Sequence, residues 1–213
     1  MHKVGVLGSG EVGQTLAKGF RKHGHEVRIG SRSPGKLASF SAESGIEAAT
    51  FEAVAAWGDL LVLAVHGAAA LNALTLAGAR HLDGKIVIDT TNPISDAPPV
   101  NGVLQLFTGP NTSLMEQLQQ AFPDARLVKA FNSVGSARMV DPSFEDGKPT
   151  MFYCGNDQAA RDKVRHILED FGWEPADMGV AEAARPIEAL SQLWCIPGFL
   201  RDSSGHAFKV LWS

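Results

Sequence analysis

The chain has 213 residues and a mass of 22.6 kDa, which suits one large domain or two small ones. Its hydrophobic fraction of 45% is enough for a sizeable core and excludes global disorder. A net charge of −4 argues against general binding to nucleic acid or to an anionic membrane surface. The chain contains two cysteines, too few for a disulfide framework, and no signal-peptide pattern, so we expect a reduced, cytoplasmic protein.

Short apolar runs alternate with helix-like stretches through the first 89 residues. Strands are predicted at 3–7, 26–29, 46–49, 60–65 and 85–89, and helices lie between them at 11–23, 34–44, 51–57 and up to about residue 80. This alternation is typical of βαβ units, and right-handed crossovers then give a doubly wound, parallel sheet in the order 3-2-1-4-5. The charge-free stretch 60–79 is long enough to span a bilayer, but its interruptions favour a buried strand followed by a packed helix.

The remainder of the chain continues the same α/β pattern. Residues 90–112 carry four prolines and two glycines and are predicted to form a long functional loop. Further strands and helices are expected to complete the sheet. In chain order they are a helix at 113–121, strands at 126–131 and 150–154, a helix at 157–171 and a strand near 173–176. A last helix is expected from about 180 to 194. We therefore predict one domain over residues 1–213, with helices on both faces of a mainly parallel sheet of the Rossmann type.

A glycine-rich turn directly follows the first strand and opens the first helix. The segment Gly8-Ser9-Gly10-Glu11-Val12-Gly13 matches G-x-G-x-x-G. Gly8 permits the tight turn, Gly10 lets the backbone approach a pyrophosphate, and Gly13 permits close helix–strand packing. Glu11 is compatible with this role because the helix dipole favours an acid in the first turn, where the side chain can point to solvent. The turn predicts a dinucleotide site; the alternative is a purely structural glycine turn.

The end of the second strand distinguishes NAD from NADP. NAD enzymes place a carboxylate there to accept a hydrogen bond from the ribose 2′-hydroxyl, and this chain has none. Instead, Ser31, Arg32 and Lys36 provide a hydrogen-bond donor and two cations for a 2′-phosphate. The pattern favours NADP(H), and the alternative is a solvated basic loop.

Ligands of such sheets lie beyond the carboxyl ends of the strands, so the residues that follow each strand are candidates for the site. We expect Val65, His66, Asn92 and Pro93 to contact the cofactor. His66 and Asn132 are the catalytic candidates, mainly as groups that position the rings. His66 can alternatively cap the next helix or pair with the ribose.

Other side chains in this region favour a structural role. Lys129 forms a polar pair with Asn132 or crosses to another helix, and Tyr153 and Cys154 lie in a strand that is predicted to be core. The sequence shows no metal-ligand spacing, no Cys/His nucleophilic pair and no G-x-S-x-G motif. No metal site is therefore predicted.

Several segments together resemble one family of oxidoreductases. The motifs are GSGEVG, IGSRSP, KIVIDTTNPIS, VKAFNSVG, MFYCGNDQAARDKV, ARPIEALSQLW and GHAFKVLW. They resemble the NADPH-dependent reductases of the deazaflavin coenzyme F420, and are also similar to the cytosolic oxidoreductase domain of the STEAP-type metalloreductases. The resemblance implies that Ser9, Ser31, Arg32 and Lys36 hold the NADP phosphates. It also implies that the C-terminal part, from about 180 to 213, closes the site and a homodimer.

The resemblance has a departure that bears on the second substrate. Many deazaflavin reductases carry a Pro-Trp pair after the fourth strand, where this chain has His66-Gly67. The segment Asn132-Ser133-Val134-Gly135 is nearer the metalloreductase form. The acceptor is therefore left open among F420, FMN, FAD and other small molecules.

The sequence thus predicts an NADP(H)-dependent oxidoreductase that exchanges hydride with a flavin-like acceptor. Transfer between two cofactor rings needs orientation more than a strong general acid, which suits a site without an obvious acid. Two alternatives remain: an NADPH-dependent reductase of a small imine or carbonyl compound, using His66 or Lys129, and a non-catalytic NADP(H) sensor.

Overall fold

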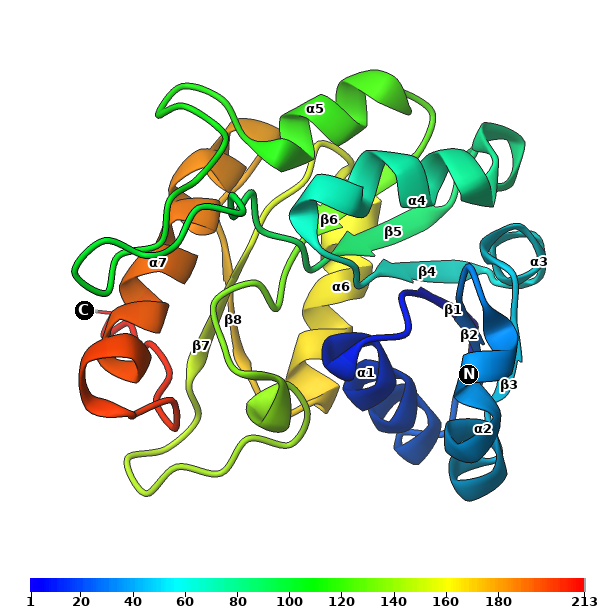
Figure 1. Ribbon diagram of the computed structural model, residues 1–213, viewed down its shortest axis with the longest axis horizontal. Helices are drawn as coiled ribbons and strands as arrows, with labels where there is room; N and C mark the ends of the chain where they lie inside the picture. The colour runs from blue at the N-terminus through cyan, green and yellow to red at the C-terminus, as the bar shows by residue number, and fades with distance from the viewer. Residues whose placement is uncertain (213) are drawn as a thin grey trace.

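The main sheet has six parallel strands in the order β3-β2-β1-β4-β5-β6 (Figure 1). The computed structural model describes residues 1–212. The strands are β1 (Lys3–Leu7), β2 (Glu26–Gly30), β3 (Glu47–Ala49), β4 (Leu60–Leu63), β5 (Ile86–Asp89) and β6 (Arg126–Lys129). The order reverses between β1 and β4, so the doubly wound sheet that the βαβ pattern predicts is confirmed.

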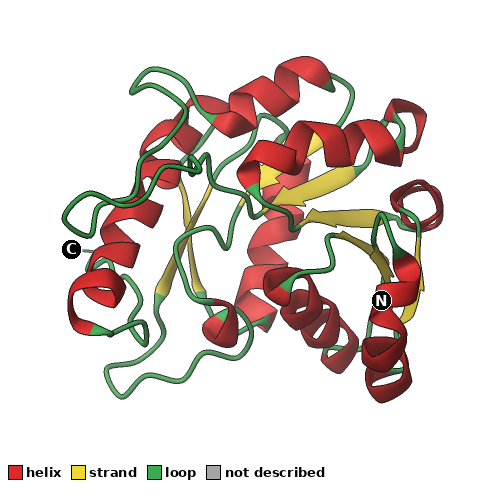
Figure 2. Ribbon diagram, in the orientation of Figure 1, coloured by secondary structure: helices red, strands yellow, loops and turns green. Residues whose placement is uncertain are grey.

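Helices cover both faces of this sheet and bury two apolar cores (Figure 2). One face is covered by α1 (Glu11–Lys22), α2 (Ala38–Ser44) and α6 (Gln158–Asp170), and the other by α3 (Phe51–Trp57), α4 (Ala70–Ala77), α5 (Leu114–Ala121) and the start of α7 (Ala184–Arg201). Leu16 and Phe20 of α1 are fully buried, as their helical spacing predicts. The 60–79 stretch forms β4 and α4, and within residues 1–212 no helix has the length and apolarity to cross a membrane.

The strands after β6 do not complete the main sheet, and that prediction is wrong. β7 (Thr150–Tyr153) and β8 (Glu174–Asp177) pair with each other in a separate two-stranded parallel sheet. This sheet meets β6 at a single antiparallel bridge between Lys129 and Cys154. A Cβ atom on Gly155 would lie 2.5 Å from the Leu127 carbonyl oxygen, so the chain passes close to β6 directly after this bridge.

The proline-rich segment after β5 is a long loop, as the sequence predicts, and it carries two isolated bridges. Residues 94–106 form an arm with antiparallel bridges between Ile94 and Leu106 and between Val100 and Val103. The arm lies against α7, where the Gln192 amide donates to the Leu104 carbonyl at 2.6 Å. Within the described chain, short 3₁₀ turns complete the connections at Pro34–Leu37, Gly67–Ala69, Ala79–His81, Ser136–Arg138 and Ala181–Ala183.

The last helix starts later and ends later than predicted. α7 starts at Ala184 and runs through Pro197 to Arg201, whereas the sequence pattern ends the helix near residue 194. Leu200 packs against the arm so closely that a Cβ atom on Gly102 would lie 2.9 Å from the Leu200 side chain. α7 thus continues through Pro197, and its last turn packs against the arm.

Candidate functional site

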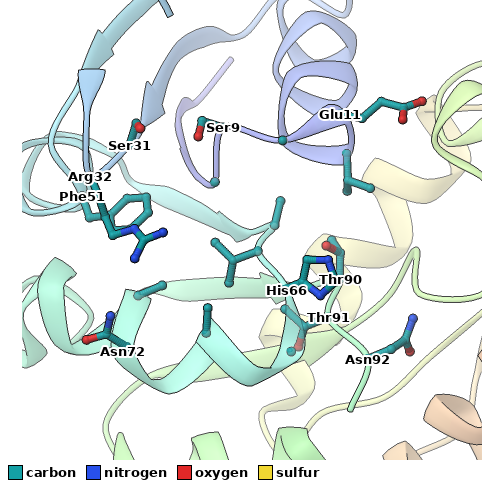
Figure 3. A pocket seen from close by; sticks show the side chains of 18 of the residues that line it. Ser9, Glu11, Ser31, Arg32, Phe51, His66, Asn72, Thr90, Thr91 and Asn92 are labelled. Atoms are coloured by element: carbon teal, nitrogen blue, oxygen red, sulfur yellow. The ribbon is translucent and has the colours of Figure 1, made fainter. Parts of the chain in front are cut away.

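A cavity of about 640 Å³ opens at the carboxyl ends of the strands (Figure 3). Its walls come from the segments that follow β1, β2, β4 and β5 and from the first turn of α4. This is where the reversal of strand order leaves a crevice in a doubly wound sheet. Most of the predicted site residues line it: Gly8, Ser9, Gly10, Glu11, Val12, Ser31, Arg32, Lys36, Val65, His66 and Asn92.

The three glycines of the first turn are needed for different reasons. Gly8 has φ +145°, and a Cβ atom there would lie 1.9 Å from the Ala64 carbonyl oxygen. A Cβ atom on Gly13 would lie 2.1 Å from the Gly8 carbonyl oxygen, so Gly13 packs helix against strand and does not line the cavity. Gly10 has no atom within 4 Å of its Cβ position. That open space, in front of the unpaired N–H groups of α1, fits a pyrophosphate.

Glu11 lies in the first turn of α1 but turns away from Ser9 (Figure 3). Its carboxylate accepts a hydrogen bond from the Ser136 hydroxyl, on the turn that follows β6. The prediction that this acid points to solvent is therefore incomplete, because the side chain bridges two loops. The orientation leaves the N-terminus of α1 available for an anion.

The end of β2 gathers hydroxyl and cationic groups at one side of the cavity. Ser31 is buried and accepts a hydrogen bond from the Ser33 backbone N–H at 3.1 Å. Arg32 and Lys36 are exposed, and none of the ion pairs within residues 1–212 involves either of them. Two unpaired cations beside a hydroxyl suit a phosphate, and this wall carries no carboxylate that would repel one.

The sequence analysis missed residues that line the same end of the cavity, on α3 and around the start of α4. Phe51 starts α3 directly after β3, and Ala69, Asn72 and Ala73 lie at the start of α4. The rule that the residues after each strand form the site identifies Phe51. Asn72 carries a weaker signal, since it is a polar interruption in an otherwise apolar stretch.

The opposite side of the cavity is formed by the segments after β4 and β5. Val65, His66, Thr90, Thr91, Asn92 and Ile94 line it. His66 is exposed, and its side chain makes no capping hydrogen bond to the following turn. A Cβ atom on Gly67 would lie 1.9 Å from the Asn92 carbonyl oxygen, so the two segments touch at this point. The His66-Gly67 pair thus combines an open imidazole with a glycine that close packing requires.

Asn132 and Pro93 lie behind the wall and do not line the cavity. The Asn132 amide donates to Asn92 Oδ1 at 3.0 Å and to the Ile187 carbonyl of α7 at 2.8 Å, and the Asn92 amide donates to the Asn132 carbonyl at 2.7 Å. Phe131, with φ +61°, sets the direction of the chain at this point. Asn132 therefore acts on the cavity through Asn92.

Lys129 is fully buried at the end of β6 and forms a charged cluster with two carboxylates. Its Nζ lies 2.6 Å from Asp89 Oδ2 and 2.9 Å from Glu188 Oε1, and it donates to the Thr91 carbonyl at 2.7 Å. Burial opposes the charge, but Asp89 and Glu188 outweigh it and raise the pKa of Lys129. Lys129 does not line the cavity, and an ammonium held by three partners with a raised pKa is a weaker acid than a free lysine. The proposed polar pair with Asn132 is absent, and the prediction that Lys129 crosses to another helix is confirmed by Glu188 of α7.

Glu188 also holds the start of α5 next to the segment that forms the cavity wall. Its carboxylate accepts hydrogen bonds from the backbone N–H groups of Leu114 and Met115 at 2.8 and 3.0 Å, at the start of α5. Asp89 Oδ1 accepts from the Thr91 backbone N–H at 2.9 Å and from its hydroxyl at 2.7 Å. The cluster fixes the segment that presents Thr91 and Asn92.

Tyr153 and Cys154 are core residues, as the sequence predicts. Both are buried, and the Cys154 thiol lies 3.9 Å from the Met115 sulfur. Burial raises the pKa of Tyr153 and that of the Cys154 thiol to about 12 each. Neither side chain lines the cavity.

Comparisons with known proteins agree with this geometry. The family described as NADP oxidoreductase, coenzyme F420-dependent, matches residues 3–93. The crystal structure of a proposed F420-dependent NADP reductase from Arthrobacter sp. FB24 is 36% identical, with a TM-score of 0.93 over 100% of both chains. The chain belongs to the F420-dependent NADP oxidoreductase family. The family takes its name from NADP and from dependence on coenzyme F420.

Two more distant relatives put the family in a wider context. The metalloreductase STEAP3 of Rattus norvegicus is 30% identical over 202 residues, which cover 93% of this chain and 39% of that protein. The chain thus spans 35–39% of the length of the curated relatives that it matches. The imine reductase of Streptomyces aurantiacus is 18% identical with a TM-score of 0.68, covering 93% of this chain and 63% of that one, and it shares the fold.

Proposed function

We propose that the protein transfers hydride between the nicotinamide of NADP(H) and a flavin-like acceptor, F420 or a flavin such as FMN or FAD. The observation that carries this proposal is the composition of the wall after β4 and β5. Among the described residues of that wall, His66 is the one titratable side chain, while Lys129 is buried in an ion cluster and Tyr153 in the core. Direct transfer between two rings requires alignment at about 3–3.5 Å and no proton donor at the reacting carbon.

The described residues account for each part of NADP(H). The N–H groups at the start of α1 and the open space over Gly10 receive the pyrophosphate. Ser31, Arg32 and Lys36 hold the 2′-phosphate. Val65, His66 and Asn92 border the nicotinamide half, which supplies or accepts the hydride when bound. In this arrangement Asn132 and the Lys129 cluster keep the Asn92 segment in place.

The test is to mix the purified protein with NADPH and either F420, FMN or FAD, and to follow the absorbance of both rings. We expect oxidation of NADPH coupled to reduction of at least one of these acceptors. Absence of turnover with every acceptor, by protein that binds NADPH, contradicts the proposal.

His66 separates this proposal from reduction of a small imine or carbonyl compound, because His66 is the proton donor available at the wall. If His66 donates a proton to substrate, His66→Ala abolishes turnover and shifts its pH profile. If hydride passes between rings, His66→Ala changes turnover by less than about tenfold.

A further inference from the structure

The cavity has a second recognition element on the wall opposite Arg32. Arg32 comes from the segment after β2, while Asn72 comes from the first turn of α4. The two side chains lie at the same end of the cavity and face each other across it, with the Phe51 ring beside Arg32 (Figure 3). His66 and Asn92 lie at the other end.

Asn72 has features of a ligand-binding side chain. It is exposed, and within residues 1–212 its amide makes no hydrogen bond to the protein. The neighbouring residues that line the cavity are small: Ala69, in the turn before α4, and Ala73 of α4. An exposed asparagine inside a short helix gains nothing for helix stability, since alanine has the higher helix propensity.

The geometry of this end suits a flat base with a polar edge. Arg32 presents a planar guanidinium, which stacks on aromatic faces while its N–H groups bind a phosphate. The carboxamide of Asn72 carries one donor and one acceptor, the combination that pairs with the N6 amino group and a ring nitrogen of adenine.

We propose that Asn72 recognises the adenine base of NADP(H), whose ring stacks on Arg32. This inference rests on the proposed function, in which Ser31, Arg32 and Lys36 hold the adjoining 2′-phosphate. Asn72 then sets base specificity, whereas Arg32 and Lys36 set the preference for a phosphorylated ribose. The two preferences come from different walls of the cavity and are separable.

The experiment compares NADPH with its hypoxanthine analogue, in which a carbonyl oxygen replaces the adenine amino group. Dissociation constants are measured for the full chain by quenching of tryptophan fluorescence, with no acceptor present. We expect the wild type to bind NADPH about 5-fold to 10-fold more tightly than the analogue, the lower part of the range for a bidentate amide–adenine pair. Asn72→Ala and the isosteric Asn72→Leu are expected to bind both dinucleotides equally.

Arg32→Ala is the matched control from the opposite wall. It is expected to lose the preference for NADPH over NADH while it keeps the preference for adenine over hypoxanthine. The Asn72 variants are expected to show the reverse, and their far-ultraviolet circular dichroism should match the wild type because an exposed helical site tolerates alanine.

The outcomes separate the inference from the proposed function. If the wild type binds NADPH but does not distinguish the two bases, or if Asn72→Ala keeps the distinction, the role of Asn72 is wrong. If the wild type does not bind NADPH at all, the proposed function fails and the inference fails with it.

Discussion

Gly10→Ala tests the pyrophosphate site without disturbing the fold. The new Cβ atom meets no protein atom within 4 Å, and the backbone at Gly10, with φ −76° and ψ −176°, is open to alanine. Replacing the N-cap glycine lowers the free energy of unfolding, and the reduced conformational freedom of the unfolded chain raises it. Each effect is about 1 kcal/mol or less, and the two oppose each other. The free energy of unfolding should therefore change by less than about 1 kcal/mol. The methyl group occupies the space of the pyrophosphate, so NADPH should bind at least about tenfold more weakly, or about 1.4 kcal/mol.

Gly67→Ala is the matched control for stability, because its methyl group clashes with a protein atom whereas that of Gly10→Ala does not. The Cβ atom would lie 1.9 Å from the Asn92 carbonyl oxygen, and contacts under 3.0 Å force the backbone to shift. Overpacking of this kind costs about 1–3 kcal/mol. Urea unfolding and NADPH titration of both variants give the answer. If Gly10→Ala binds NADPH with wild-type affinity, the assignment of the pyrophosphate to this space is refuted. If Gly10→Ala loses as much free energy of unfolding as Gly67→Ala, the space beside Gly10 is not open.

Three further predictions concern charge. Arg32→Ala should weaken NADPH by at least about tenfold more than NADH in fluorescence titrations, since it removes a charge-assisted phosphate contact; equal losses would contradict the 2′-phosphate site. Lys129→Met leaves two buried carboxylates without their cation and should lower the free energy of unfolding by about 3–5 kcal/mol in urea, whereas the exposed Lys148→Met should cost under about 0.5 kcal/mol; similar values for both would show that the cluster does not stabilise the fold. Hydrogen bonds from Arg185 lower the pKa of Glu116, so the stability from this pair is present above pH 4.5 and is lost as the pH falls through the lowered value. Arg185→Gln should therefore be less stable than the wild type at neutral pH. Unfolding measured at a series of acid pH values should show that this difference vanishes.

The main sheet and the glycine turn were predictable because their signals are local. Apolar runs of strand length alternate with helices, and the first turn carries its glycines in the one order that the backbone contacts require. The pairing of β7 with β8 was not predictable in this way. Periodicity identifies a strand but not its neighbour, and β7 pairs with β8 from a later part of the chain instead of with the edge of the main sheet.

The residues of the site likewise divide into those with a local sequence signal and those without one. The hydroxyl and cationic groups after β2 follow from their position at a strand end, whereas Asn72 lies on a helix surface where a polar residue is ordinary. The sequence left two roles open for Lys129. Tertiary structure decides between them, because Glu188 approaches from the distant helix α7.

Glu188 has a consequence for the order in which the chain can mature. A nascent chain that ends before α7 contains all six strands of the main sheet, yet its Lys129 lacks one carboxylate and the first N–H groups of α5 lack their acceptor. The Asn132 amide likewise lacks its acceptor, the Ile187 carbonyl of α7, until that helix has been synthesised. The cavity wall is therefore completed late in biosynthesis, after the main sheet has been synthesised. A fragment that ends before α7 would lack the contacts that hold this wall in place.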